Sequence, residues 1–181
     1  MKTSCKALRS AAFITIACLS IVSCGQKKPA DQANSELRIG IVAKSLGNGF
    51  FDAVHKGADE AAAELGVKII FTGPTTPTAE GQAEVINALI AQHVDAIAVS
   101  ANDPDALVPA LKRAMQRGIK VLSYDSAVER EGRIVHLSPS SDALIGETCA
   151  QLAAEAAPNA TGKLAVVSAT PTSTNQNAWL A

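Results

Sequence analysis

The feature that most constrains the fold is a regular alternation of short apolar runs with amphipathic segments. Residues 37–43 form an apolar run, and residues 50–65 repeat apolar side chains at helical spacing until Gly66, a residue suited to end a helix. Similar pairs follow along the chain at intervals typical of one βα unit. Continuous apolar strands indicate a parallel sheet that helices cover on both faces. We therefore expect an α/β fold with an open doubly wound parallel sheet, in three α/β/α layers.

The same patterns set the expected bounds of the elements. Strands are predicted over residues 37–43, 67–71, 95–100, 119–123, 134–137 and 163–168. Helices are predicted over residues 50–65, from an N-cap at Thr76, from Asp103 to Gly118, and over residues 141–157. The last helix carries an apolar stripe that includes Leu144, Cys149 and Leu152. We expect this stripe to point inward, with Cys149 as a buried structural thiol.

The N-terminal residues are typical of an export signal. Positive residues precede an apolar run over residues 10–22, which is shorter than the roughly 20 residues that a membrane-spanning helix needs. The run ends at Ile-Val-Ser-Cys24-Gly, which resembles a bacterial lipobox. This resemblance implies that residues 1–23 are a lipoprotein signal peptide and that Cys24 carries the lipid anchor. A plain secretory signal with a chance cysteine is the alternative. Residues 24–36 are polar and predict a flexible tether.

The composition and motifs exclude several function classes. With 16 basic and 17 acidic residues, the chain lacks the basic excess of a nucleic-acid binder. It has no dinucleotide-binding, Walker or nucleophile-elbow motif, so no cofactor is expected. The histidines His55, His93 and His136 lack metal-ligand spacing, and no metal is expected.

Catalysis is also not expected from the strand ends. These ends offer Ser45, Ser100 and Ser123 as nucleophiles, with no histidine expected nearby. Asp103 has the position of a helix cap, and Asp105 that of a first-turn residue, which are structural roles. We therefore expect a protein that is not an enzyme.

Ligands of open α/β sheets bind at the carboxyl ends of the strands. The segments at these ends contain charged and amide side chains and one aromatic ring: Lys44, Asn48, Phe50, Asn102, Asp125, Asn175 and Gln176. Together they suit a small molecule rich in hydroxyl groups, since each hydroxyl both donates and accepts a hydrogen bond. Simple packing is the alternative for Phe50, and a structural salt bridge is the alternative for Lys44 with Asp125.

Four longer motifs carry a family resemblance. They cover residues 43–51 (AKSLGNGFF), 72–77 (TGPTTP), 94–107 (VDAIAVSANDPDAL) and 172–177 (TSTNQN), and the short pair Gly81-Gln82 adds to them. They resemble the sugar-binding lipoproteins and periplasmic proteins of ABC importers, which are type 1 periplasmic binding proteins. The rhamnose-binding group is the most similar, and the autoinducer-2-binding group is a near relative. The resemblance implies a two-lobed clamp that encloses a sugar and delivers it to an ABC permease and its ATPase, or that presents it for chemotaxis. It also implies a protein exported to the cell envelope.

Individual residues carry the resemblance further. Lys44 and Asp125 match ligand-contacting residues of the autoinducer-2 group, whereas Asn175-Gln176 stands where that group has Asp-Gln. An amide donates as well as accepts, so this difference favours rhamnose or another deoxyhexose, with autoinducer-2 as the alternative. The resemblance implies that residues 37–157 form the N-terminal ligand-binding lobe. Residues 158–181 would be the truncated start of the second lobe, leaving Leu164, Val166 and Val167 without cover and transport impaired.

Overall fold

The computed structural model of the chain describes residues 36–159 and 161–181. The expected signal peptide over residues 1–23, the lipidation site Cys24 and all of the tether except residue 36 lie outside the described residues. Among the residues described, no helix is both long and apolar enough to span a lipid bilayer.

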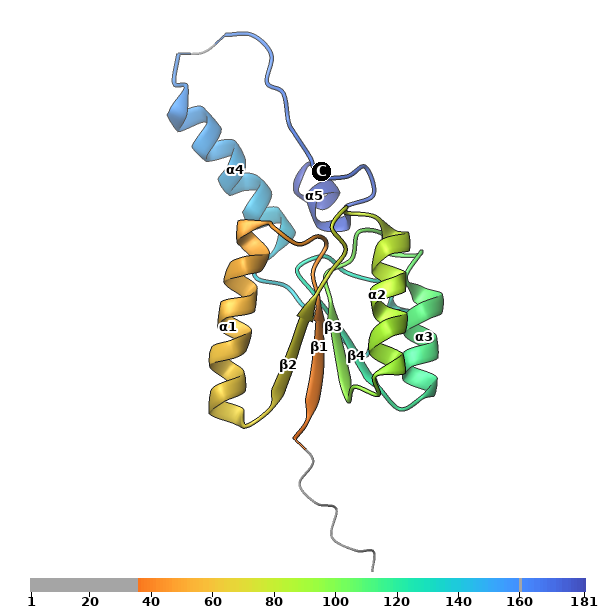
Figure 1. Ribbon diagram of the computed structural model, residues 1–181. Coiled ribbons are helices and arrows are strands. Elements are labelled where there is room, and N and C mark those ends of the chain that lie inside the picture. The colour runs from red at the N-terminus through yellow and green to blue at the C-terminus, as the bar shows by residue number, and fades with distance from the viewer. Residues whose placement is uncertain (1–35, 160) are drawn as a thin grey trace, which may run out of the picture. The chain divides into compact units, whose positions relative to one another are not determined.

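The described residues form a parallel five-stranded sheet (Figure 1). Its strands are β1 (Arg38–Val42), β2 (Lys68–Thr72), β3 (Ala96–Val99), β4 (Lys120–Tyr124) and β5 (Val135–Leu137). The order across the sheet is β2-β1-β3-β4-β5, and every neighbouring pair is parallel. The predicted open parallel α/β sheet is therefore confirmed.

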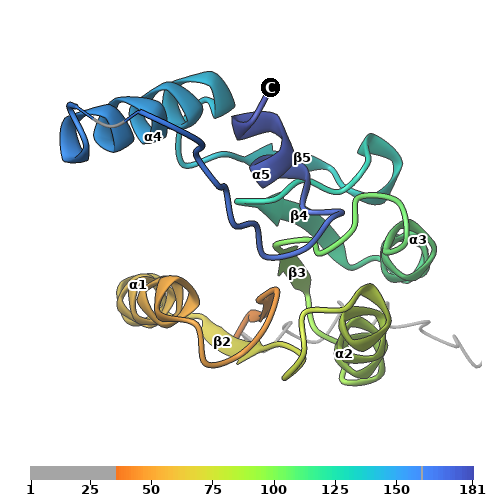
Figure 2. The same cartoon turned by 90° about the horizontal axis from the view of Figure 1, so that it is seen from above.

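Helices cover both faces of this sheet. Helix α1 (Gly49–Leu65) lies on one face, while α2 (Ala79–Ala91) and α3 (Val108–Gln116) lie on the other (Figure 2). The larger apolar core fills the space beneath α2 and α3, where Ile86, Ile97 and Leu111 are fully buried. Burying each such side chain contributes about 1.5–3 kcal/mol, so this layer stabilises the sheet that carries the site. A smaller cluster under α1 includes Phe51 and Tyr124.

The ends of α1 agree with the sequence pattern. Asn48 caps the start, where its side chain accepts a hydrogen bond of 2.9 Å from the Phe50 backbone N–H. Gly66 ends the helix with a φ of +65°, in the left-handed conformation that costs glycine little. The predicted Gly66 cap is therefore confirmed.

The starts of α2 and α3 differ from the expected positions. Thr78, rather than Thr76, caps α2, because its hydroxyl accepts from the backbone N–H of Gly81 at 3.1 Å. Helix α3 begins at Val108 rather than beside Asp103. Asp103 does act as a cap, but for a separate turn that precedes α3. Its carboxylate accepts hydrogen bonds from the backbone N–H groups of Asp105 and Ala106.

Helix α4 (Asp142–Ala156) corrects a second expectation. None of its residues is buried, and Leu144 and Leu152 are 55% and 59% exposed. Cys149 is exposed as well, so its predicted burial is wrong. The apolar pattern predicted a helix correctly. However, α4 extends beyond the carboxyl edge of the sheet and contacts α5 (Thr174–Trp179), so its stripe has no sheet face to cover (Figure 1).

Residues 163–168 do not form the expected sixth strand. Within the described part of the chain, no neighbouring strand pairs with this segment, and an isolated strand is unstable in water. Leu164, Val166 and Val167 are exposed, as expected. The last strand, β5, follows a short 3-10 helix, η1 (Arg130–Gly132), and forms one edge of the sheet.

Candidate functional site

The predicted site residues come together at the carboxyl edge of the sheet. The strands after β1 lie on both sides of it, so the strand order reverses between β1 and β3. In an open α/β sheet, the crevice at such a reversal is the usual ligand site. A cavity of about 340 Å³ lies there. All seven residues that the sequence singled out line it: Lys44, Asn48, Phe50, Asn102, Asp125, Asn175 and Gln176. The other lining residues are Ser45, Phe51, Pro77, Ala169 and Trp179.

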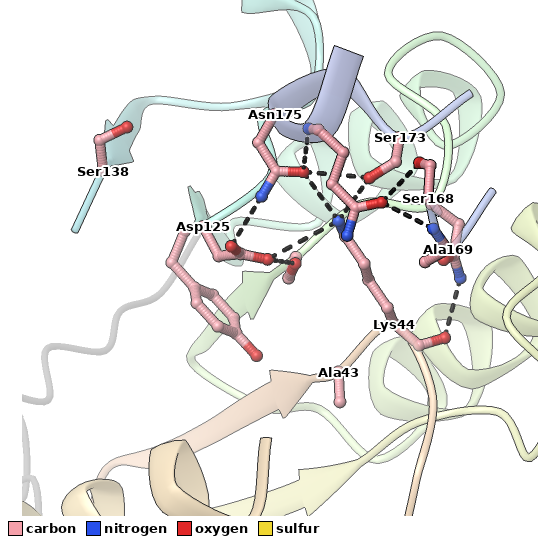
Figure 3. A network of polar contacts seen from close by, with 12 residues as sticks. Ala43, Lys44, Asp125, Ser138, Ser168, Ala169, Ser173 and Asn175 are labelled. Carbon is pink, nitrogen blue, oxygen red and sulfur yellow. Dashed lines mark hydrogen bonds and ion pairs between the residues drawn. The ribbon is translucent and has the colours of Figure 1, made fainter. Parts of the chain in front are cut away.

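Lys44 lies at the centre of a polar network (Figure 3). Its ammonium group donates to Ser173 Oγ at 2.9 Å and to Asn175 Oδ1 at 3.0 Å, and lies 3.8 Å from Asp125 Oδ2. An ammonium has three donors, and two of them are used in these hydrogen bonds, while the contact with Asp125 is an ion pair longer than a hydrogen bond. Burial lowers the pKa of Lys44, and the charge of Asp125 opposes this shift. The salt bridge offered as an alternative for this pair is therefore present within the site itself.

Asp125 follows β4 directly and bridges three elements. Its Oδ1 atom accepts from the Asn175 amide at 2.8 Å, and its Oδ2 atom accepts from the Ser100 hydroxyl at 2.6 Å. Its backbone has a φ of +57°, a left-handed conformation that only Gly, Asn and Asp adopt readily. An ionised carboxylate has about four lone-pair sites, so Asp125 can accept from a further donor.

Gln82 fixes the loops that carry these side chains. It is fully buried, and its amide nitrogen donates to the carbonyl oxygens of Ala43 at 3.0 Å and Ser100 at 2.7 Å. Its Oε1 atom accepts from the Asn102 backbone N–H at 2.8 Å. One side chain thus joins the ends of β1 and β3. The sequence pattern placed Gln82 on the apolar face of a helix and did not indicate this role.

Asn102 contains an acceptor that the described residues leave without a partner. Its amide nitrogen donates to the Lys44 carbonyl at 2.8 Å, which fixes the orientation of the amide. Its Oδ1 atom is buried and has no hydrogen-bond partner in the part of the chain that the structure describes. A buried acceptor without a partner costs about 1–3 kcal/mol, and this atom has almost no accessible surface.

Three further lining residues keep groups that their internal contacts do not use. The side-chain oxygen of Asn48 is occupied by the α1 cap, which leaves its amide N–H groups for other contacts. Gln176 Oε1 accepts from the Ser168 hydroxyl and the Ala169 N–H, both at 2.7 Å, and its amide nitrogen is not used in these contacts. Phe50 is 48% exposed and packs edge-to-face on Phe51 at 5.1 Å, so packing accounts for only part of its ring.

Three contributors were not singled out from the sequence as site residues. Ser100 contacts Asp125, Ser173 contacts Lys44, and Trp179 forms part of the cavity wall. A signal for Ser100 existed, since it directly follows an apolar strand just as Asp125 does. Ser173 and Trp179 follow a segment without regular structure, and their contacts depend on how α5 returns to the sheet.

The structure also corrects the expectation that no histidine lies near a strand-end serine. Ser123 and His136 are paired across β4 and β5, and His136 Nδ1 lies 2.8 Å from Ser123 Oγ. Ser123 is fully buried, and the other ring nitrogen lies 3.3 Å from Ser138 Oγ, so its hydrogen-bonding neighbour is a hydroxyl and not a carboxylate. Burial and the charge of Arg133 lower the pKa of His136. This pair therefore lacks the access and the orienting acid of a catalytic triad.

The part of the chain that the structure describes contains no cluster of metal-binding side chains. Over residues 36–159 and 161–181, no three His, Cys, Asp or Glu side chains lie close enough together to hold a metal ion.

A comparison with known protein families identifies the chain's family. Residues 39–181 match the model of the periplasmic binding protein domain. The chain belongs to this family.

Two solved structures and one curated protein show what the chain is similar to. The chain is 37% identical, with a TM-score of 0.75, to an ABC transporter solute-binding protein from Clostridium phytofermentas with bound L-rhamnose, over 80% of this chain and 45% of that one. LsrB from Clostridium saccharobutylicum in complex with AI-2 is 27% identical, with a TM-score of 0.73, over 79% of this chain and 46% of that one. The ribose import binding protein of Bacillus subtilis is 30% identical over 71% of this chain and 42% of its own length. The chain thus spans less than half the length of each relative.

Proposed function

We propose that the cavity binds a small sugar, L-rhamnose or a similar deoxyhexose. The observation that carries this proposal is that both hydrogen-bond donors and hydrogen-bond acceptors line one cavity and are not used by contacts within the protein. The carboxylate of Asp125 can accept, while the amide groups of Asn48 and Gln176 can donate. A hydroxyl group needs partners of both kinds, and a sugar carries several hydroxyls close together.

Aromatic rings supply the second half of the argument. Phe50 and Trp179 both line the cavity, and the ring of Phe50 is half-exposed. Such rings pack against the C–H surface and the methyl group of a deoxyhexose, whose apolar face needs burial. The cavity volume of about 340 Å³ also falls within the range that small-ligand sites occupy.

The choice of rhamnose rests on Asn175. Its amide donates to Asp125 and accepts from Lys44, so this position carries no second carboxylate. The autoinducer-2 group, as the sequence resemblance implies, has an aspartate there, and a carboxylate would require an additional donor from the ligand. The 37% identity to a rhamnose-bound structure supports the same choice. Autoinducer-2 is the second candidate, supported by the similarity to LsrB.

The proposed function of the whole protein follows from the family. We propose that residues 37–157 form the first lobe of a two-lobed clamp and that residues 158–181 begin the second lobe. The clamp would pass its sugar to an ABC permease and its ATPase, without catalysis and without a cofactor. Export by residues 1–23 and a lipid anchor on Cys24 would hold it at the cell envelope.

Saturation-transfer NMR on the full chain tests the sugar proposal, because it detects weak binding to a site open to solvent. We expect transfer to L-rhamnose, strongest at its methyl protons, and loss of this signal in Phe50→Ala. Leu46→Ala is the matched control, since Leu46 is exposed in the loop that leads into α1 but does not line the cavity. Transfer to autoinducer-2 without transfer to rhamnose would favour the alternative. No transfer to either ligand would contradict the proposed site.

A further inference from the structure

Helix α5 brings Asn175 and Gln176 into the cavity wall, and its place there depends on α4. Within the described chain, α5 follows a stretch without regular structure. Its contacts with α4 lie beyond the carboxyl edge of the sheet and involve the first turns of α4 (Figure 1).

Gly146 allows the closest of these contacts. A Cβ atom at position 146 would collide with the carbonyl oxygen of Trp179 and lie 3.2 Å from its carbonyl carbon. The obstacle is backbone, which cannot rotate away as the end of a flexible side chain can. The α5 backbone can therefore approach α4 this closely only while residue 146 has no side chain.

A hydrogen bond fixes the same end of α5 from a second direction. The indole N–H of Trp179 donates to Asp142 Oδ1 at 3.0 Å, and Asp142 is the first residue of α4. Trp179 follows Asn175 by four residues, so both side chains project from the same side of α5. Fixing the Trp179 side chain therefore also fixes the position of Asn175.

We infer that Gly146 and the Asp142–Trp179 hydrogen bond form a seat that positions Asn175 and Gln176 in the cavity wall. Gly146 and Asp142 are positioning residues, because they act on the site through α5, whereas Trp179 also lines the cavity itself. The part of the inference that concerns ligand affinity rests on the proposed sugar function. The part that concerns α5 does not.

The test is Gly146→Ala in the full chain, with two readouts that need no ligand. Trp179 is the only tryptophan of the chain, so its fluorescence reports on the seat alone. We expect red-shifted emission and greater quenching by acrylamide in the variant. The side-chain amide signal of Asn175, assigned with Asn175→Ala, should shift in a proton–nitrogen spectrum.

Gly57→Ala is the matched control, since a Cβ at this helical glycine would meet nothing within 4 Å and both readouts should stay unchanged. Trp179→Phe removes the indole N–H but keeps an aromatic ring, and it should shift the Asn175 signal in the same direction. In saturation-transfer titrations, Gly146→Ala should weaken L-rhamnose binding about tenfold, the loss expected when a hydrogen-bonding group moves out of register. In an Asn175→Ala background most of this effect should disappear.

The outcomes separate the two proposals. Unchanged Trp179 emission and an unchanged Asn175 amide signal in Gly146→Ala would overturn the seat. Changed signals with undiminished sugar binding would overturn its role in positioning the wall. If both signals change while no form of the chain binds sugar, the seat is supported and the proposed sugar function fails.

Discussion

Replacing Asn175 by Asp tests the charge balance of the site most directly. The amide of Asn175 donates to Asp125 Oδ1 at 2.8 Å, and its oxygen accepts from Lys44 at 3.0 Å. Asn175→Asp keeps the size and the acceptor but replaces the donor with an oxygen that faces a carboxylate. Two carboxylates so close together raise the pKa of one of them.

The magnitude follows from the contacts that change. A hydrogen bond to a charged group contributes about 1.5–3 kcal/mol, and the variant loses one. A stronger bond from Lys44 offsets part of this loss. The pair takes up a proton more readily in the folded than in the unfolded chain, because its folded pKa is raised. The cost is therefore full above that raised pKa and shrinks as the pH falls towards the usual aspartate value of about 4.

Urea unfolding at about pH 8 and about pH 5 measures both parts of this prediction. Asn175→Asp should lower the free energy of unfolding by roughly 1.5–3 kcal/mol at the higher pH and by clearly less at the lower one. Asn177→Asp is the matched control, since Asn177 is exposed on the same helix and donates only to the Pro171 carbonyl. Equal losses at both pH values, or equal effects of the two variants, would refute the reasoning.

Three further predictions concern the scaffold. Gln82→Leu leaves three buried backbone groups without partners and should lower the free energy of unfolding by about 3 kcal/mol or more. A loss below about 1 kcal/mol in urea unfolding would contradict the role of Gln82 in joining the strands. Gly66→Ala should cost about 1 kcal/mol because of its φ of +65°, while Gly57→Ala in the same helix should not lower the melting temperature. The pKa of His136 is lowered in the folded chain, so stability should fall as the pH drops below about 6.5, where the unfolded chain binds the proton first. Denaturation at several pH values should show a smaller decline in His136→Gln; identical slopes would rule out this cause.

The strand ends were predictable from the sequence because their geometry follows from topology. Apolar runs stop at Lys44 and Asp125, and parallel strands bring such ends to one edge. Local chemistry was less decisive at helix starts. Thr76 and Thr78 both have a side chain that can cap, and only the folded loop shows which hydroxyl reaches an N–H group.

The predictions that were wrong concern contacts between residues that are far apart in the sequence. The pattern of α4 is amphipathic, but a pattern does not say what covers the apolar stripe, and Cys149 is exposed as a result. The Ser123–His136 pair results from the register between two strands. Ser173 reaches Lys44 across 129 positions of the chain, a separation over which local propensity carries no information.

The left-handed backbone of Asp125 limits how this site can be redesigned. A φ of +57° admits Asp, Asn and Gly readily and penalises β-branched or bulky side chains by about 1–2 kcal/mol, so most clones of a library randomised at this codon would be destabilised. Ser100, which contacts the same carboxylate from an ordinary strand end, carries no such restriction. However, Ser100 is fully buried and does not line the cavity, so the proposed sugar site would be varied better at Gln176, which lines the cavity from α5, with Asp125 kept as a constant anchor.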